Sequence, residues 1–318
     1  MPAATILIIA RRDDVHAQVM AAAAEKHDAC AVIFDTADIP SVDRATLRFS
    51  GDRTEFEIRS AHSKLSFDDV RSVWWRRPSS PRIAEEVADD HARQFCIRES
   101  EMLLRGALDA ANVPVINDPA AQTRAARKPL QLAVARSLGL MVPRTVMSND
   151  PDTIRDLWEA TAGKCVYKTF TAPVGRMAET RRLTQDVLAD LQRLRHAPII
   201  AQELIDGRDL RATVIGDHVF AAAGCARLPA RHLDGRLDLT TTWQPHDLPD
   251  ETRRSLVLLA RSLGLDYGCV DLRLRPDGQY VFLEINPAGQ FLFIEIDTGQ
   301  PLIQSLLELL LEPRCRQT

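Results

Sequence analysis

Three side chains that carry oxygen ligands lie close together near the end of the chain. Asp271 stands in one apolar strand pattern, and Glu284 and Asn286 stand in the next. The segment between them, Arg275–Gly278, is typical of a tight turn, so Asp271 and Glu284 are expected on paired strands. Residues two positions apart on a strand face the same way, which places Asn286 beside Glu284. Either acid alone would be typical of a solvated hairpin, but two carboxylates and an amide together predict a Mg²⁺ site.

Two lysines are candidates for contact with an anionic ligand. Lys128 stands at the start of a predicted helix, and Lys168 ends the apolar strand pattern Val166–Lys168. A lysine on the buried face of a strand requires an anionic partner. The alternative is a solvated surface position, which explains Lys128 equally well when it is taken alone.

Charged residues alternate on a strand near the middle of the second half of the chain. Asp209 and Arg211 are two positions apart and therefore share one face. Arg211 is suited to clamping a phosphate or an acyl-phosphate, and Asp209 to orienting it or binding a ribose hydroxyl. Arg227, on the following strand, is a second candidate for an anion clamp. A surface ion pair is the alternative interpretation of each.

A strand that ends in a loop is a candidate for binding an adenine ring. Its residues are Gln202, Glu203, Leu204 and Ile205. The backbone at such an edge can hydrogen-bond to a base, and the apolar side chains can cover its faces. An ordinary buried strand is the alternative.

The elements that must position these side chains alternate between strand and helix. Strands are predicted over 6–10, 29–35, 73–78, 142–147, 166–168 and 198–205, and helices over 16–26, 92–111, 128–140, 152–162, 185–195, 251–263 and 302–311. No glycine fingerprint follows the first strand, which argues against a Rossmann dehydrogenase. We place a domain boundary after residue 116 and divide 117–318 into lobes 117–200 and 201–318.

Composition narrows the class of protein. The chain has 318 residues, of which 45% are hydrophobic and 26% charged, and its net charge is −4. This balance predicts no attraction to nucleic acid or to an anionic membrane. The six cysteines show no Cys-x-x-Cys spacing, so neither a disulfide framework nor a zinc site is indicated. No apolar run is long enough to span a bilayer, and we expect a cytoplasmic protein.

From Asn117 onward, the order of these residues resembles that of the ATP-grasp carboxylate-amine ligases. Two stretches are similar to a narrower group, the graspetide macrocyclases, which are microviridin-type maturases of ribosomal peptides. The first is Val73–Pro78, and the second is Phe282–Phe291 with Ile294–Glu295 and Thr298–Gly299 after it.

The resemblance implies an α/β (α+β) chain with an ATP-grasp fold. An N-terminal α/β pre-ATP-grasp domain would precede a central helical and strand subdomain and a C-terminal antiparallel-sheet subdomain. ATP would phosphorylate a side-chain carboxylate of a precursor peptide, leader plus core. A hydroxyl or amine of the same peptide would then attack the acyl-phosphate and close an ω-ester or ω-amide ring.

The resemblance also implies roles for the candidate residues. Mg²⁺ would bridge the phosphates, lysines would neutralise their charge, and arginines would stabilise the transferring group. The expected metal ligands are Asp271, Glu284 and Asn286; the expected ATP-binding residues are Lys128, Lys168, Gln202, Glu203, Leu204, Ile205 and Asp209; the expected catalytic residues are Arg211, Arg227 and Arg273.

Two other functions stay open at this point. A ligase could add a free amino acid, such as glutamate, to a carboxylate, or the domain could be an inactive binding module. The intact set of acids and lysines argues against inactivity. A homodimer is expected from the resemblance, and the leucine-rich helix 302–311 is expected to pack inside or to help form that dimer. Trp74 and Trp75 are expected in the core and Arg76 and Arg77 in solvent, with no catalytic role.

Overall fold

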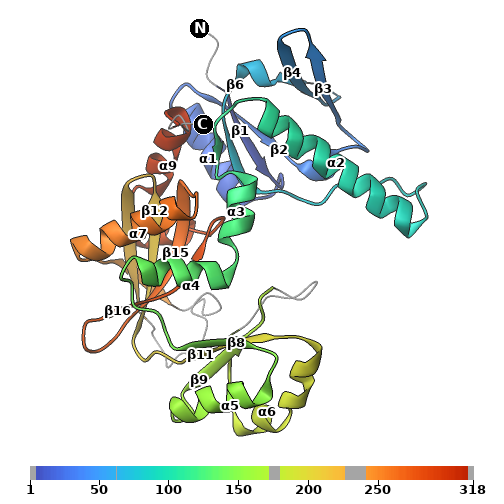
Figure 1. Ribbon diagram of the computed structural model, residues 1–318. Coiled ribbons are helices and arrows are strands. Elements are labelled where there is room, and N and C mark those ends of the chain that lie inside the picture. Colours follow the sequence, from blue (N-terminus) through green and yellow to red (C-terminus); the bar gives the residue numbers. More distant parts are fainter. Residues whose placement is uncertain (1–4, 62, 172–179, 226–240, 314–318) are drawn as a thin grey trace.

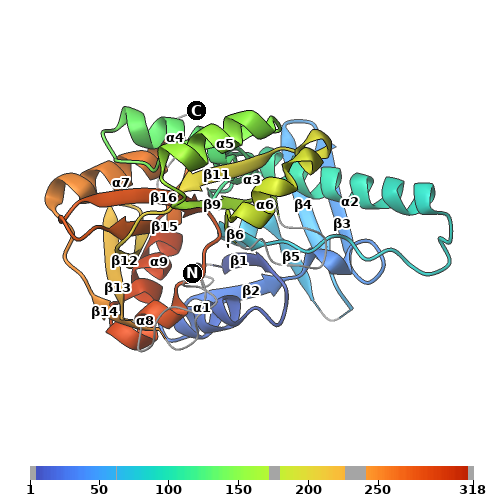
Figure 2. The same ribbon diagram turned by 90° about the horizontal axis from the view of Figure 1, so that it is seen from below.

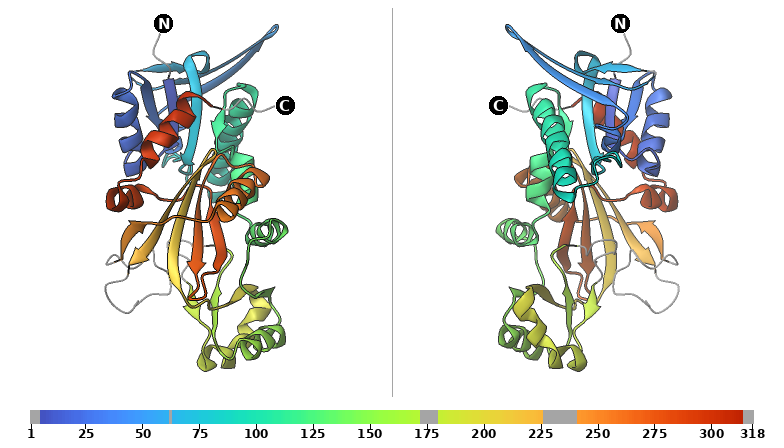
Figure 3. Two further views of the ribbon diagram at one scale, coloured as in Figure 1. Left: turned by 90° about the vertical axis from the view of Figure 1, so that its left-hand side faces the viewer. Right: turned by 90° about the vertical axis from the view of Figure 1, so that its right-hand side faces the viewer.

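The computed structural model describes residues 5–61, 63–171, 180–225 and 241–313. An N-terminal domain, a five-stranded antiparallel sheet with its helices, and a small lobe follow one another along the molecule (Figure 1). Side views place the N-terminal domain and the small lobe at opposite ends of this sheet (Figure 3). This architecture confirms the α/β (α+β) class and the antiparallel sheet expected in the C-terminal part. Within the described ranges, no helix is long and apolar enough to cross a membrane.

The N-terminal domain is built on a parallel sheet with the order β2-β1-β6-β7. Its elements are β1 (Thr5–Ala10), α1 (Val15–Glu25), β2 (Cys30–Phe34), β6 (Val70–Arg77), α2 (Asp90–Ala110) and β7 (Val115–Ile116). Strand β1 pairs on both edges, with β2 and β6, and it is buried along its whole length because Ile6 and Ile8 pack in one core and Leu7 and Ile9 in another. Helix α1 begins where the Asp14 carboxylate accepts a hydrogen bond from the Ala17 N–H at 3.0 Å.

A second, antiparallel sheet extends from this domain with the order β3-β4-β5. It comprises β3 (Arg44–Ser50), β4 (Arg53–Arg59) and β5 (Lys64–Ser66), and short 3-10 turns, η1 (Thr36–Asp38) and η2 (Phe67–Asp69), connect it to the parallel sheet. The β3–β4 turn passes through Gly51, whose φ of +62° lies in the left-handed region that glycine adopts without strain.

The small lobe is a four-stranded antiparallel sheet covered by short helices. Its order is β10-β9-β11-β8. The elements are β8 (Thr145–Ser148), α5 (Pro151–Ala160), β9 (Cys165–Lys168), β10 (Arg181–Arg182), α6 (Gln185–Ala189), the 3-10 helix η3 (Leu191–His196) and β11 (Ile199–Glu203). Seen from below, this lobe lies in front of the large sheet (Figure 2).

The large sheet has the order β14-β13-β12-β15-β16, and every pair in it is antiparallel. Its strands are β12 (Arg208–Ile215), β13 (His218–Cys225), β14 (Thr242–Pro245), β15 (Tyr267–Leu274) and β16 (Tyr280–Asn286). The associated helices are α3 (Pro119–Ala125), α4 (Lys128–Ser137), α7 (Asp250–Ser262), α8 (Leu292–Thr298) and α9 (Leu302–Leu311). Helices α4 and α7 cover one face with a core of leucine, valine and alanine.

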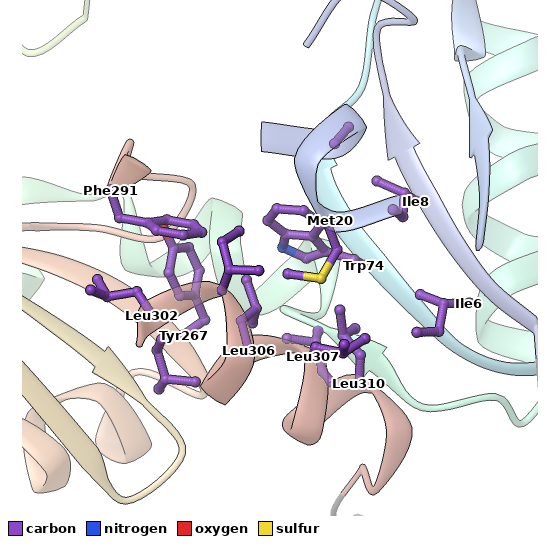
Figure 4. Close-up of a cluster of buried hydrophobic side chains, with 14 of the residues drawn as sticks. Ile6, Ile8, Met20, Trp74, Tyr267, Phe291, Leu302, Leu306, Leu307 and Leu310 are labelled. Atoms are coloured by element: carbon purple, nitrogen blue, oxygen red, sulfur yellow. The ribbon is translucent and has the colours of Figure 1, made fainter. Parts of the chain in front are cut away.

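Helix α9 joins the two ends of the chain in one core. Leu302, Leu306 and Leu310 are fully buried, and they belong to the same hydrophobic core as Ile6 and Trp74 of the N-terminal sheet (Figure 4). The interior position expected for this helix is confirmed. Its excess of leucine is explained because the helix lies between the N-terminal domain and the large sheet and buries apolar side chains against both.

Most predicted helices are present, with two differences. The pattern over 185–195 divides into α6 and η3, and α3 and α8 were not anticipated. A start signal for α3 is nonetheless in the sequence: the Asp118 carboxylate accepts from the Ala121 N–H at 2.8 Å, and Pro119 occupies the first turn.

Candidate active site

The charged candidates form two cross-strand pairs on one face of the large sheet. Arg211 on β12 stands opposite Asp271 on β15, and Asp209 stands opposite Arg273 in the same register. Arg211 Nη1 lies 2.5 Å from Asp271 Oδ1, and Arg273 Nη1 lies 2.8 Å from Asp209 Oδ1. The alternation of strand residues therefore gathers two arginines and two acids along one surface.

The third strand, β16, completes the expected metal-ligand set. Glu284 stands opposite Asp271. The Asn286 amide nitrogen lies 3.1 Å from Glu284 Oε1 and 3.5 Å from Asp271 Oδ2. The three side chains converge as the strand pattern predicts. Rotation of the amide about its terminal bond would turn its oxygen toward the same point.

The chemistry of this donor set fits Mg²⁺. Mg²⁺ is held in nucleotide sites by one or two carboxylates, with substrate phosphates and water completing its shell. Among the residues that the structure describes, no group of three or more His, Cys, Asp or Glu side chains is placed to hold a metal. Asp271, Glu284 and Asn286 offer only oxygen as ligand atoms, which favours a hard cation shared with phosphates.

Both candidate lysines reach the same carboxylate from different elements. Lys128 Nζ, from the first turn of α4, donates to Glu284 Oε2 at 2.7 Å. Lys168 Nζ, from β9 of the small lobe, lies 3.8 Å from the same oxygen. Their side chains are only 19% and 16% exposed, so neither lysine is a solvated surface residue. The ammonium groups meet where the small lobe faces the large sheet.

Arg211 is buried and firmly held. It is 4% exposed, and its Nη2 donates to the Gln290 carbonyl at 3.0 Å. Burial alone would lower the pKa of its guanidinium, but the negative charge of Asp271 more than offsets this, so the pKa is raised. Within the described part of the chain, Arg211 Nε is buried without a hydrogen-bond partner. Arg227 lies outside the described residues.

The predicted adenine-binding segment begins in β11 of the small lobe and continues into the connection to β12. Gln202 is buried and donates to Thr145 Oγ1 at 3.0 Å. The Leu204 N–H donates to the Lys164 carbonyl at 2.9 Å, so that N–H is engaged within the protein. Ile205 is buried, and Glu203 ends β11. Adenine binding by these residues stays a prediction.

Two buried amides that the sequence did not single out hold β16, which carries two of the candidate metal ligands, and the residue that follows it. Gln131 on α4 donates to the Ile285 carbonyl at 2.8 Å and accepts from the Ile285 N–H at 3.2 Å. Ile285 lies between Glu284 and Asn286 on an edge strand, so Gln131 takes the place of a further strand. Asn117 donates to the Tyr267 carbonyl at 2.6 Å and to the Pro287 carbonyl at 3.0 Å. In the sequence, Gln131 is marked only as a polar residue at a position where the helix pattern favours an apolar one.

Two protein-family models match consecutive parts of this chain. The model for the MvdD pre-ATP grasp domain matches residues 5–124, and that for the RimK-like ATP-grasp domain matches residues 125–310. The chain belongs to the RimK-like ATP-grasp family. The resemblance of residues 117 onward to ATP-grasp ligases is thereby confirmed, and the matched N-terminal model agrees with the similarity to microviridin-type enzymes.

Solved structures of this RimK-like ATP-grasp type extend the likeness over nearly the whole chain. The macrocyclase MdnC from Microcystis aeruginosa, bound with precursor peptide MdnA, is 29% identical with a TM-score of 0.87. The alignment covers 97% of this chain and 99% of MdnC. The ATP-grasp ligase PsnB, complexed with minimal precursor, Mg and ADP, is 27% identical with a TM-score of 0.78 and 96% coverage of both chains.

Curated relatives match a shorter segment. A probable alpha-L-glutamate ligase 2 from Shewanella denitrificans is 32% identical over 180 residues. That match covers 52% of this chain and 57% of the relative. The chain thus spans little more than half the length of the curated relatives it matches.

Proposed function

We propose that this protein is an ATP-dependent ligase that macrocyclises a ribosomally made precursor peptide, leader plus core, by forming side-chain ω-ester or ω-amide bonds. The observation that carries the proposal is the convergence of Lys128, Lys168 and Arg211 on the Asp271–Glu284–Asn286 face. The likeness to MdnC and PsnB, which includes the N-terminal domain, supports the choice of a peptide substrate.

The residues present suit transfer of a phosphoryl group. Asp271, Glu284 and Asn286 would hold Mg²⁺, which, when bound, neutralises charge on the phosphate oxygens. Lys128 and Lys168 hold their ammonium groups at Glu284, beside the candidate Mg²⁺ ligands, and would neutralise phosphate charge there. Arg211 keeps its charge because Asp271 stabilises it, and that positive charge would stabilise the transferring group.

The reaction needs no protein nucleophile. A peptide carboxylate oxygen takes the γ-phosphoryl group, which releases ADP and forms an acyl-phosphate. A hydroxyl or amine of the same peptide then attacks the acyl carbon, phosphate leaves, and the attacking group loses its proton. The peptide loses one water for each ring. The arginines on this face stabilise negative charge in both steps.

A second candidate function is addition of a free amino acid, such as glutamate, to a carboxylate. The identity with probable alpha-L-glutamate ligases favours it, but that likeness covers only about half of this chain. It would use the same ATP-binding and acyl-phosphate chemistry with a separate amine. The family resemblance further leads us to propose a cytoplasmic homodimer.

The test incubates the purified protein with ATP, Mg²⁺ and the small peptides encoded beside its gene, and measures intact peptide mass. Loss of one or more waters, absent in Glu284→Gln, supports macrocyclisation. A gain equal to an amino acid residue, seen only when free amino acids are supplied, favours the second function. An unchanged mass for every neighbouring peptide, with the protein folded, contradicts macrocyclisation.

A further inference from the structure

The loop that follows the last metal-ligand candidate is bound by side chains at each of its first four carbonyls. We define this as the 287–292 loop, Pro287–Leu292, which begins directly after Asn286. The donors to its carbonyls are Asn117 to Pro287, Arg76 and Arg77 to Ala288, Arg76 and Tyr267 to Gly289, and Arg211 to Gln290. A loop held in this way has little freedom to move.

The N-terminal domain supplies much of this grip through the end of β6. Arg76 is 1% exposed, and its Nη1 lies 2.5 Å from the Ala288 carbonyl and 3.1 Å from the Gly289 carbonyl. Arg77 Nη2 adds a bond to the Ala288 carbonyl at 3.0 Å. The expectation that Arg76 is solvated is therefore wrong, because the loop and Trp74, 5.6 Å from the guanidinium carbon, cover it. Trp74 and Trp75 are in the core as expected.

Helix α1 holds the far end of the loop. His16 Nε2 accepts from the Phe291 N–H at 3.1 Å and the Leu292 N–H at 3.3 Å. Burial, aided by the positive charge of Arg76, lowers the pKa of His16 to about 4, although Asp14 opposes the shift. A neutral ring with an acceptor nitrogen is what two backbone donors require.

The opposite side of the loop touches the catalytic arginine. A Cβ placed on Gly289 would lie 2.9 Å from Arg211 Nη2 and 2.7 Å from Cys269 Sγ. No side chain fits there, and Arg211 Nη2 donates to the next carbonyl, that of Gln290. A movement of the loop would therefore move both Asn286, which precedes it, and Arg211, which donates to it.

The hydrogen bonds from the N-terminal domain to the 287–292 loop lie where parallel sheets of this kind bind ligands. In the strand order β2-β1-β6-β7, the chain proceeds from β1 to one side of the sheet and from β6 to the other side. Ligands of parallel sheets bind at such a switch point, beside the carboxyl ends of the two strands. Arg76 stands at the carboxyl end of β6, and His16 lies just past that of β1. In this protein, the chain's own 287–292 loop lies at that position.

We propose that Arg76 is a positioning residue for the ligase site. By fixing the 287–292 loop from the N-terminal domain, it sets the places of Asn286 and Arg211. The proposal rests on the proposed function, since it assigns Asn286 and Arg211 to Mg²⁺ and phosphoryl binding. It gives the N-terminal domain a direct part in ordering the nucleotide site.

The test compares Arg76→Met with a matched control, Ser72→Ala. Ser72 also lies on β6, is fully buried, and donates across the domain boundary, but to the Leu310 carbonyl of α9 at 2.7 Å. Both variants remove a buried bond between the domains, and only Arg76→Met removes bonds to the 287–292 loop. Arg76→Lys, which keeps the charge and one donor direction, serves as the second variant if Arg76→Met does not fold.

Two measurements decide the outcome. Hydrogen exchange without nucleotide is expected to accelerate in peptides covering 284–292 in Arg76→Met and to be unchanged there in Ser72→Ala. In calorimetric ADP titrations, the Mg²⁺ concentration for half-maximal binding is expected to rise about tenfold or more in Arg76→Met, the usual size of an outer-shell effect on a metal site. Arg76→Lys is expected to recover part of both changes.

Two results would overturn the proposal. One is slow exchange of 284–292 with normal Mg²⁺ dependence in Arg76→Met; the other is equal changes in Arg76→Met and Ser72→Ala, which would indicate general loosening of the interface. Failure of the proposed function is distinguishable, because wild-type protein would then leave the mass of every neighbouring peptide unchanged, whereas neither measurement on Arg76→Met uses a peptide substrate. The exchange measurement on nucleotide-free protein still reports on the loop in that case.

Discussion

Replacement of Gln131 by leucine is expected to weaken both the fold and the proposed Mg²⁺ site. Gln131 is 1% exposed, and its side chain donates to the Ala125 and Ile285 carbonyls and accepts from the Ile285 N–H. Leucine fills similar space but makes none of these bonds. The two backbone groups of Ile285 would then be buried without a partner, directly between Glu284 and Asn286.

The magnitude follows from those bonds. Each Ile285 group left buried without a partner costs about 1–3 kcal/mol, and the lost bond to the Ala125 carbonyl about 0.5–1.5 kcal/mol, so the free energy of unfolding should fall by roughly 2.5–7.5 kcal/mol. The middle of this range does not exceed the stability of an ordinary domain, about 5–15 kcal/mol, so the variant should stay folded with much reduced stability. Because β16 loses the support of α4, the Mg²⁺ concentration for half-maximal ATP turnover should rise about tenfold or more.

The assay pairs urea unfolding with a Mg²⁺ titration of ATP turnover in the presence of peptide substrate. The control is Gln122→Leu, which removes one bond, to the Trp75 carbonyl at 2.7 Å, and touches neither ligand strand. It should cost about 1 kcal/mol and leave the Mg²⁺ dependence unchanged. If Gln131→Leu is destabilised but binds Mg²⁺ normally, β16 holds its ligands without Gln131 and the reasoning is wrong.

Three further predictions follow from the same contacts. Gly289→Ala should displace Arg211 and lower ATP turnover, whereas Gly106→Ala, with open space at its Cβ, should fold and turn over ATP normally; equal activities would refute the close packing. The lowered pKa of His16, about 4 against 6.5, means that the unfolded chain binds the proton more tightly. The contribution of neutral His16 to the free energy of unfolding is therefore complete above pH 6.5 and falls toward pH 4 by about 1.4 kcal/mol per pH unit. His16→Gln should make the urea midpoint of unfolding less dependent on pH between 6.5 and 4. Leu306→Ala should lower the free energy of unfolding by about 2–5 kcal/mol through a buried cavity, and a smaller loss would mean that α9 repacks.

The local sequence pattern was sufficient to predict those elements whose geometry depends on residues close together in the chain. The hairpin of β15 and β16 follows from alternation around the Arg275–Gly278 turn, and its register brings Asp271 opposite Glu284. The bounds of α9 agree with the predicted helix 302–311 because its leucines recur at helical spacing. The metal-ligand candidates could thus be chosen before the fold was known.

The local sequence pattern was insufficient to predict the burial and the hydrogen-bond partners of Arg76 and Gln131. A strand that ends in two arginines is typical of a solvated edge, and only the loop 212 residues further on, at Ala288, buries the first of them. Gln131 is one polar residue in an amphipathic helix, and its partner Ile285 is 154 residues away. Contacts at such separations leave no period in the local sequence.

The sequence by itself determined the type of chemistry: which side chains could bind Mg²⁺ and phosphate, which strands carry them, and which family the chain resembles. These properties depend on residue type and on short-range periodicity, which are fully written in neighbouring positions. Only the tertiary structure decided that Lys128 and Lys168 meet at one carboxylate, that α9 joins the N-terminal core, and that the N-terminal domain grips the 287–292 loop. Those outcomes depend on how separate elements pack, and burial, not spacing along the chain, selects that packing.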